Sequence, residues 1–242
     1  MRVTFPRVMF SEWTKFLALR STWLLFALSA AATVGLSAAI AARATDPSSS
    51  TPYLGIDVIS LVLGVAGIVM ITGEYGSGLV RATFAAVPAR LPVLWAKGIV
   101  LAGFALPVMA VVVLLSAVVF RAVWGPLPGV GDHLVGAAVA PVMLALLGLG
   151  LGALIRHTAA AITGYVLAIL VLPALLGAAL PNDLGEKVVR YTPVALAQAL
   201  YTDTSSGDPT QMLAARPAAV ALVVWVGVVL AAGAVMMWRR DP

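Results

Sequence analysis

Residues 73–90 read GEYGSGLVRATFAAVPAR, and this stretch separates two long apolar runs. It is too polar and too rich in glycine to lie in lipid, but its second half, residues 79–87, predicts a short helix. In that helix Val80, Phe84 and Val87 share one apolar face, because they recur at helical spacing. The stretch therefore predicts a short helix at the membrane surface, held between two spans.

The composition around this stretch is that of an integral membrane protein. Hydrophobic residues make up 62% of the 242 residues, charged residues make up 10%, and the mean hydropathy is +1.04. Soluble domains carry about 25% charged residues, so this chain cannot cover its surface with polar groups. A helix needs about 20 apolar residues to cross the hydrocarbon core. Six runs meet that length: 23–41, 54–72, 99–120, 134–155, 159–180 and 218–238. We therefore expect an all-α polytopic membrane helix bundle with six transmembrane helices, forming a single domain over residues 1–242.

The positions of lysine and arginine predict how the bundle is oriented. With the N-terminus inside, the cytoplasmic basic residues are Arg2, Arg7, Lys15, Arg20, Arg81, Arg90, Lys97, Arg156, Arg239 and Arg240. The outer basic residues are Arg43, Arg121, Lys187, Arg190 and Arg216. This asymmetry is the positive-inside bias, so both termini are predicted to be cytoplasmic. The net charge of +5 then reflects anchors that face anionic lipid and predicts no nucleic-acid partner.

Two further segments complete the expected organisation. Residues 1–21 predict an amphipathic helix lying in the membrane interface, because apolar residues recur at near-helical spacing: Phe5, Met9, Trp13 and Phe16 or Leu17. Residues 181–217 form the longest external segment, and only the first half of it is semi-apolar.

The second apolar run carries a stripe of polar and small residues. Asp57, Ser60, Gly64 and Gly67 are spaced 3, 4 and 3 residues apart, which places them on one helical face. Such a stripe either packs closely against another helix or lines a pathway or a dimer face, and both interpretations stay open. The role of Asp57 also stays open, because a carboxylate near a helix N-terminus is favoured by the helix dipole alone.

Several chemistries lack support in the sequence. Gly148 and Gly152 predict a packing face inside the fourth run and not a nucleotide loop, since no strand precedes them. No segment matches the phosphate-binding loop that ends in Gly-Lys-Ser/Thr, so this chain is not expected to hydrolyse ATP by itself or to hold a cofactor. Ser77 and His157 fall on the same side, but no third group completes a hydrolase site. His133 and His157 fall on opposite sides, so no metal site is expected.

Three stretches of the chain resemble type-2 ABC exporter permeases of high-GC bacteria. They are residues 71–97, which begin ITGEYGSGLVRAT, residues 11–21, which begin SEWTK, and residues 150–158, which read GLGALIRHT. The resemblance covers nearly the whole chain in order and spacing, and residues 74–90 are its most specific part.

This resemblance implies the membrane-spanning permease subunit of an ATP-driven exporter in the bacterial plasma membrane. Such a permease pairs with a second permease chain, identical or related, and is driven by two copies of an ATP-binding subunit that holds ATP and Mg. It would export a hydrophobic or amphipathic substrate such as a drug, a natural product or a lipid. Residues 73–90 would be its coupling helix, and the residues expected at the ATPase interface are Glu74, Tyr75, Arg81, Phe84 and Arg90. The alternative is an ion-coupled secondary transporter or a channel, which usually places ionisable residues near the membrane midplane.

Overall fold

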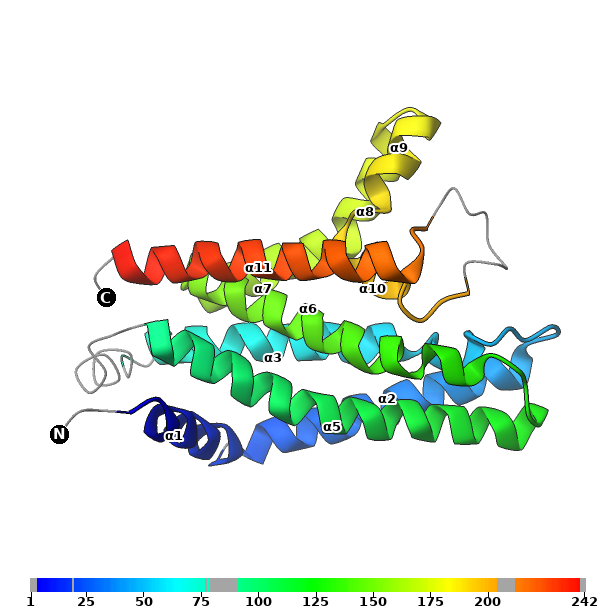
Figure 1. Ribbon diagram of the computed structural model, residues 1–242, viewed down its shortest axis with the longest axis horizontal. Coiled ribbons are helices and arrows are strands. Elements are labelled where there is room, and N and C mark those ends of the chain that lie inside the picture. The colour runs from blue at the N-terminus through cyan, green and yellow to red at the C-terminus, as the bar shows by residue number, and fades with distance from the viewer. Residues whose placement is uncertain (1–3, 19, 77, 79–90, 204–211, 240–242) are drawn as a thin grey trace.

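The computed structural model describes residues 4–18, 20–76, 78, 91–203 and 212–239, which form a helical bundle (Figure 1). All regular structure in these ranges is helical, and six helices are long and apolar enough to cross a membrane. The spans are α2 (Arg20–Arg43), α3 (Ile56–Gly76), α5 (Leu91–Trp124), α6 (Leu134–Ile155), the composite helix Thr158–Ala179, and α11 (Ala215–Arg239). The predicted all-α polytopic bundle is confirmed, and the chain is a multi-pass membrane protein.

The shorter helices connect or flank the spans. They are α1 (Phe5–Ala18), η1 (Thr51–Tyr53), η2 (Val130–His133), α9 (Asn182–Val189) and α10 (Pro193–Gln198). The composite fifth span consists of α7 (Thr158–Val166), the π-helical η3 (Leu167–Val171) and α8 (Leu172–Ala179). Its π turn ends two residues before Pro173, whose missing N–H cannot complete the regular α-helical hydrogen-bond pattern.

The third span departs most from its predicted length. Its helix begins at Leu91, eight residues before the predicted start at Ile99, and continues to Trp124. At 1.5 Å per residue, the 34 residues of α5 extend about 51 Å. This exceeds the ~30 Å hydrocarbon core, so the ends of α5 extend past that core.

The bundle has two distinct ends. The start of α1, the end of α3, the start of α5, the α6–α7 junction and the end of α11 lie at one end, here called the terminal end (Figure 1). The helices η1, η2 and α10 lie toward the opposite, distal end. Hydrogen bonds between segments far apart in sequence join the elements at both ends, and these contacts define the candidate site.

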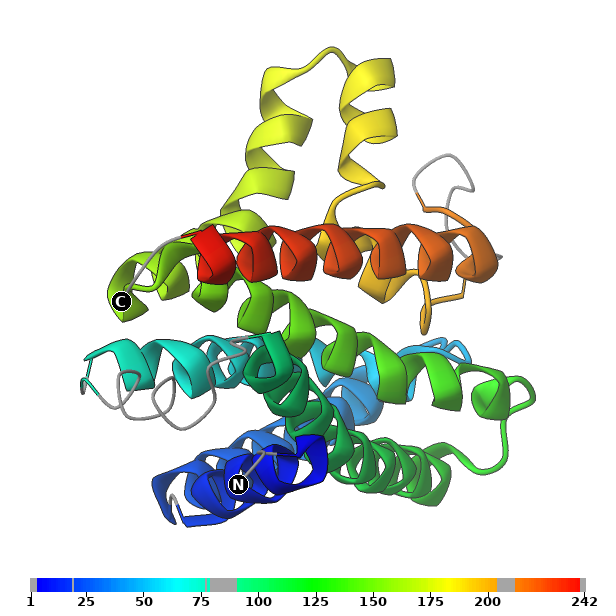
Figure 2. The same cartoon turned by 60° about the vertical axis from the view of Figure 1, so that its left-hand side comes forward.

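Helix α6 lies at the centre of the bundle and packs against α3, α5 and α11. Its closest partner is α3, and the small residues of both helices make this close approach possible. Helices α8 and α9 lie side by side and project from the flank of the bundle (Figure 2). Because α3 packs against this central helix, its terminal end lies inside the bundle, next to α5 and near α1.

Candidate functional site

A buried charge cluster lies at the terminal end, where α1, α3 and α5 meet. Helix α1 turns Val8, Glu12 and Phe16 toward the protein, at helical spacing. On the predicted interfacial face, Phe5 and Trp13 are 40% and 37% exposed, whereas Phe16 is buried against the bundle. Glu12 is buried as well, because it has a charged partner inside the bundle.

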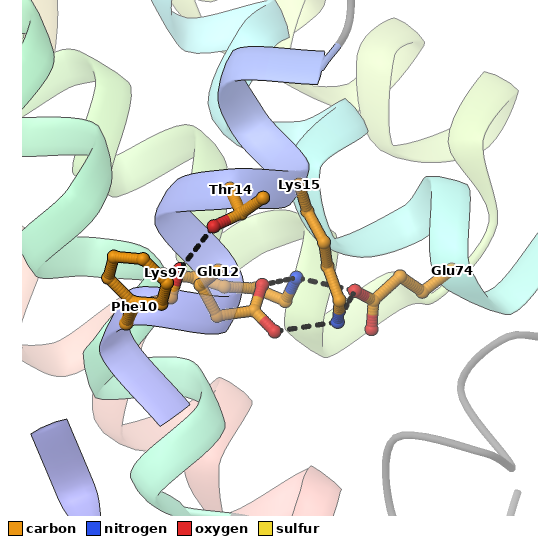
Figure 3. Close-up of polar contacts among 6 residues, drawn as sticks. All are labelled: Phe10, Glu12, Thr14, Lys15, Glu74 and Lys97. Carbon is orange, nitrogen blue, oxygen red and sulfur yellow. Dashed lines mark hydrogen bonds and ion pairs between the residues drawn. The ribbon is translucent and has the colours of Figure 1, made fainter. Parts of the chain in front are cut away.

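That partner is Lys97 of α5, and the pair belongs to a network of four charges (Figure 3). The Lys97 ammonium donates to Glu12 Oε2 at 2.5 Å and to Glu74 Oε1 at 2.8 Å. Lys15 donates to Glu12 Oε1 at 2.7 Å and to Glu74 Oε1 at 3.0 Å. Two lysines therefore bridge two glutamates, and these four charges balance.

The network differs in exposure from one side to the other. The side chains of Glu12 and Lys97 are 2% and 3% exposed, that of Glu74 is 13% exposed, and that of Lys15 is 44% exposed. Burial alone would lower the pKa of Lys15, but its hydrogen bonds and attraction to Glu12 and Glu74 outweigh this and raise the pKa above its ordinary value. Lys15 therefore stays protonated and forms the accessible edge of the cluster.

Of the five residues predicted at an ATPase interface, the structure describes Glu74 and Tyr75. Both lie in the last turn of α3, which contains the first four residues of the predicted coupling segment 73–90. Glu74 belongs to the charge network, and the guanidinium of Arg156 lies over the ring of Tyr75, 5.3 Å from its centroid. The predicted contacts Arg81, Phe84 and Arg90, and the helix predicted over residues 79–87, lie outside the described residues.

The α6–α7 junction is fixed to the same end of α3. Arg156 has a left-handed backbone with φ of 61°, ends α6, and donates from Nη2 to the carbonyl oxygen of Met236 in α11. Thr158 donates to the hydroxyl of Thr72 at 3.0 Å. The ring of His157 accepts from the backbone N–H of Ala160 as a helix cap, so this histidine has a structural role.

The central part of the predicted stripe on α3 packs inside this chain. A Cβ added to Gly64 would lie 2.0 Å from the hydroxyl oxygen of Tyr165, and one added to Gly67 would lie 2.2 Å from the carbonyl oxygen of Ala145. Ser60 is buried and donates to the carbonyl oxygen of Ile56. This part of the stripe therefore forms the contact of α3 with α6 and α7, and its role in a pathway or a dimer stays a prediction.

The glycines of α6 form the other half of the same contact. A Cβ added to Gly148 would lie 2.1 Å from the carbonyl oxygen of Gly64, and one added to Gly152 would lie 2.7 Å from the Ile71 side chain. The packing role predicted for Gly148 and Gly152 is confirmed, and its physical basis is a backbone-to-backbone approach that side chains would prevent.

Asp57 lies apart from the rest of its stripe, exposed in the first turn of α3 at the distal end. It accepts from the hydroxyl of Tyr201 at 2.7 Å and from the amide of Gln198 at 3.1 Å. Burial, followed by the negative charge of Asp57, raises the pKa of Tyr201 well above its ordinary value, so the phenol remains a donor. Asp57 therefore connects α3 to the last residue of α10 and to the segment that follows it.

A second polar contact at the distal end joins three connecting segments. Nε2 of His133 lies 3.1 Å from the Ser49 hydroxyl and 3.0 Å from Asp203 Oδ1, and Ser49 also donates to Asp203. Burial would raise the pKa of Asp203, but the bonds from Ser49 and His133 lower it below its ordinary value. A catalytic triad needs the aspartate on the other ring nitrogen of histidine. This cluster is therefore a connection between loops and not a hydrolase site.

Neither Glu12 nor Lys97 was predicted from the sequence to be a site residue. Two features of the sequence could have predicted this pair. Glu12 shares a helical face with the apolar residues Val8 and Phe16, and Lys97 lies near the start of a run of high hydropathy. Since charged residues are almost never fully buried unless paired, two such residues predict a buried ion pair. Among the described residues, no group of three or more histidine, aspartate or glutamate side chains could hold a metal ion. Comparison of the sequence with protein-family models and with curated proteins gave no match.

Proposed function

We propose that this protein is the membrane permease subunit of an ATP-driven ABC exporter, driven by separate ATP-binding subunits at the terminal end. In this proposal the terminal end is cytoplasmic, the membrane is the bacterial plasma membrane, and two permease chains form the translocation pathway. The exported substrate is hydrophobic or amphipathic.

The observation that supports this proposal most is the position of Glu74. It lies at the start of the 73–90 segment, where an ATP-binding subunit would push, and its ion pairs connect it to α1 and α5. A displacement of this segment would therefore act on three helices together and not on one flexible loop. Such rigid-body coupling is how small displacements at one site move packed helices.

The placement of charge favours this proposal over an ion-coupled transporter. In the described part of the chain, every Asp, Glu, Lys and Arg of the six spans lies within the first or last two turns of its span. Ion-coupled transporters hold their coupling ions near the bilayer midplane, where ionisable residues mark the pathway.

The test separates partner coupling from folding. The chain is reconstituted in liposomes with a candidate ATP-binding subunit, and ATP hydrolysis and substrate export are measured together. Phe84→Ala should reduce both activities strongly, because a large apolar anchor at the centre of an interface contributes a few kcal/mol. Arg81→Glu should also reduce both, because it reverses a charge at the proposed contact.

The control is Phe10→Ala, since Phe10 is an aromatic residue of α1 that is 73% exposed and is not among the predicted ATPase contacts. This variant should keep both activities. Full stimulated ATP hydrolysis in both segment variants would contradict the coupling role. Export driven by an ion gradient without ATP would instead identify a secondary transporter.

A further inference from the structure

Residues 193–203, here called the distal segment, lie across the distal end of the bundle. Helix α10 at their start packs against α6 and α11. A Cβ added to Gly136 would collide with the carbonyl oxygen of Leu200, so the segment lies directly on the start of α6. The hydroxyl of Tyr201 anchors the segment to α3, because it donates to Asp57 at 2.7 Å. Burial, followed by the charge of Asp57, raises the pKa of Tyr201 well above its ordinary value, so this anchor keeps its hydrogen near neutral pH.

A second anchor holds Asp203, the last residue of the distal segment. Oδ1 of Asp203 lies 3.0 Å from Nε2 of His133 in η2, and Ser49 of the α2–η1 connection donates its hydroxyl hydrogen to Oδ2. The same Nε2 lies 3.1 Å from the Ser49 hydroxyl oxygen, whose hydrogen is already donated. Both neighbours of Nε2 are therefore acceptors, which assigns a hydrogen to Nε2 and leaves Nδ1 as the nitrogen that gains a second proton.

The second anchor, unlike the first, contains a side chain that changes its charge near neutral pH. Burial would raise the pKa of Asp203, but its bonds with Ser49 and His133 hold the pKa below its ordinary value. The carboxylate is therefore charged at about pH 5 and above, and its stabilising contribution is lost only in stronger acid. Histidine is the side chain that becomes charged as the pH falls from about 8 to about 5. The attraction between a charged His133 and Asp203 is therefore gained in mild acid and lost as the pH rises.

The surroundings of His133 allow this change of charge. Its side chain is 16% exposed and that of Asp203 is 21% exposed, so water reaches both partners. The ring of Tyr53 in η1 meets the imidazole in a T-shaped contact, with the centroids 6.3 Å apart. Asp132, the preceding residue in η2, adds an exposed carboxylate. Neither group repels a charged imidazole, and Asp132 cannot join two segments because it lies on the same element as His133.

We propose that the cluster of Ser49, His133 and Asp203 is a pH-sensitive latch, which holds the distal segment more tightly in mildly acidic solution than in alkaline solution. The latch is a property of this chain and does not depend on ATP-driven transport. The bond between Tyr201 and Asp57 holds the same segment across this pH range. The latch therefore changes how often the end of the segment opens, while the fold stays the same.

The experiment is hydrogen–deuterium exchange of the purified full chain in neutral detergent, measured by mass spectrometry at about pH 5.5 and about pH 8. The amides of Tyr201 and Thr202 report opening of the distal segment, since each donates to the carbonyl oxygen of Gln198 at 3.0 Å. His133→Gln keeps an N–H donor but cannot gain a charge in this range. The ratio of wild-type protection to that of His133→Gln at the same pH cancels the intrinsic effect of pH on exchange. We expect this ratio to be about fivefold greater at the lower pH, the upper range for a partly exposed ion pair.

Two further variants complete the test. Asp203→Asn removes the charge of the other partner and should abolish the same pH dependence. If His133→Gln does not fold, the ratio of wild type to Asp203→Asn gives the same test. His157→Gln is the matched control and should retain the full pH dependence, because His157 is the other of the two histidines and caps α7 at the terminal end.

Equal protection ratios at the two pH values would overturn the proposal, and so would a pH dependence that survives Asp203→Asn. Loss of the pH dependence in His157→Gln would also overturn it, because the effect would then come from the terminal end.

Discussion

Replacing Lys97 with methionine should destabilise the protein strongly, because it leaves two largely buried carboxylates without one of the two lysines that they share. The Glu12 side chain is 2% exposed, and Lys97 lies 2.5 Å from it and 2.8 Å from Glu74. Removing one partner of a buried ion pair typically costs about 3–5 kcal/mol. Lys15 still contacts both carboxylates after the substitution, so we expect the lower end, about 3 kcal/mol.

The double variant Glu12→Leu/Lys97→Met should recover most of this loss. Replacing both members of a buried pair by apolar residues is often neutral or stabilising, because neither charge has to leave water. The two substitutions should therefore be strongly non-additive, with a coupling free energy of about 3 kcal/mol against the ~0.5 kcal/mol scatter of independent sites.

The assay is equilibrium unfolding of the purified chain in mixed micelles, with denaturing detergent as titrant and helical circular dichroism as the signal. Lys187→Met is the matched control, since Lys187 is an exposed lysine of α9. It should change the free energy of unfolding by no more than about 0.5 kcal/mol. If Lys97→Met unfolded like this control, or if the double variant lost the sum of both single losses, the buried cluster would not stabilise the terminal end.

Two further predictions concern packing and orientation. Gly67→Ala should cost about 1–3 kcal/mol in the same titration, because its Cβ would lie 2.2 Å from the Ala145 carbonyl oxygen, whereas Gly103→Ala, in open space on α5, should be neutral or stabilising. Equal stability of these two variants would refute the close α3–α6 contact. Because the chain has no cysteine, single cysteines report orientation: in intact cells a membrane-impermeant maleimide should label Ser206→Cys and leave Ser77→Cys unlabelled. The reverse labelling pattern would invert the proposed topology.

The fold could be predicted from local properties of the sequence. Six apolar runs separated by polar or glycine-rich segments leave helices as the solution, since a backbone in lipid must satisfy its hydrogen bonds within each segment. The bounds of α6 match the predicted run at both ends. The start of α5 does not match. The predicted run starts after Lys97, because a lysine interrupts a run of high hydropathy, but the helix begins before this lysine, at Leu91.

The candidate site could be predicted only in part. The stripe on α3 and the glycines of α6 were visible as small residues at helical spacing, but the sequence could not show that Gly64 meets Gly148 and Tyr165. The interfacial face of α1 was predicted from its large apolar residues. That Glu12 lies on the side of α1 that is buried against the bundle could not be predicted, since hydropathy assigns a glutamate to the solvent side.

The sequence by itself determined the number of spans, their approximate lengths and the polar segments between them, because hydropathy and helical period are properties of neighbouring residues. Only the tertiary structure decided that Glu12 and Lys97, 85 residues apart, neutralise each other. It also decided that Ser49, His133 and Asp203 meet at the distal end. The physical reason is that a buried charge is tolerated only where a side chain of opposite charge lies next to it. Whether two such residues meet depends on how whole helices pack against one another.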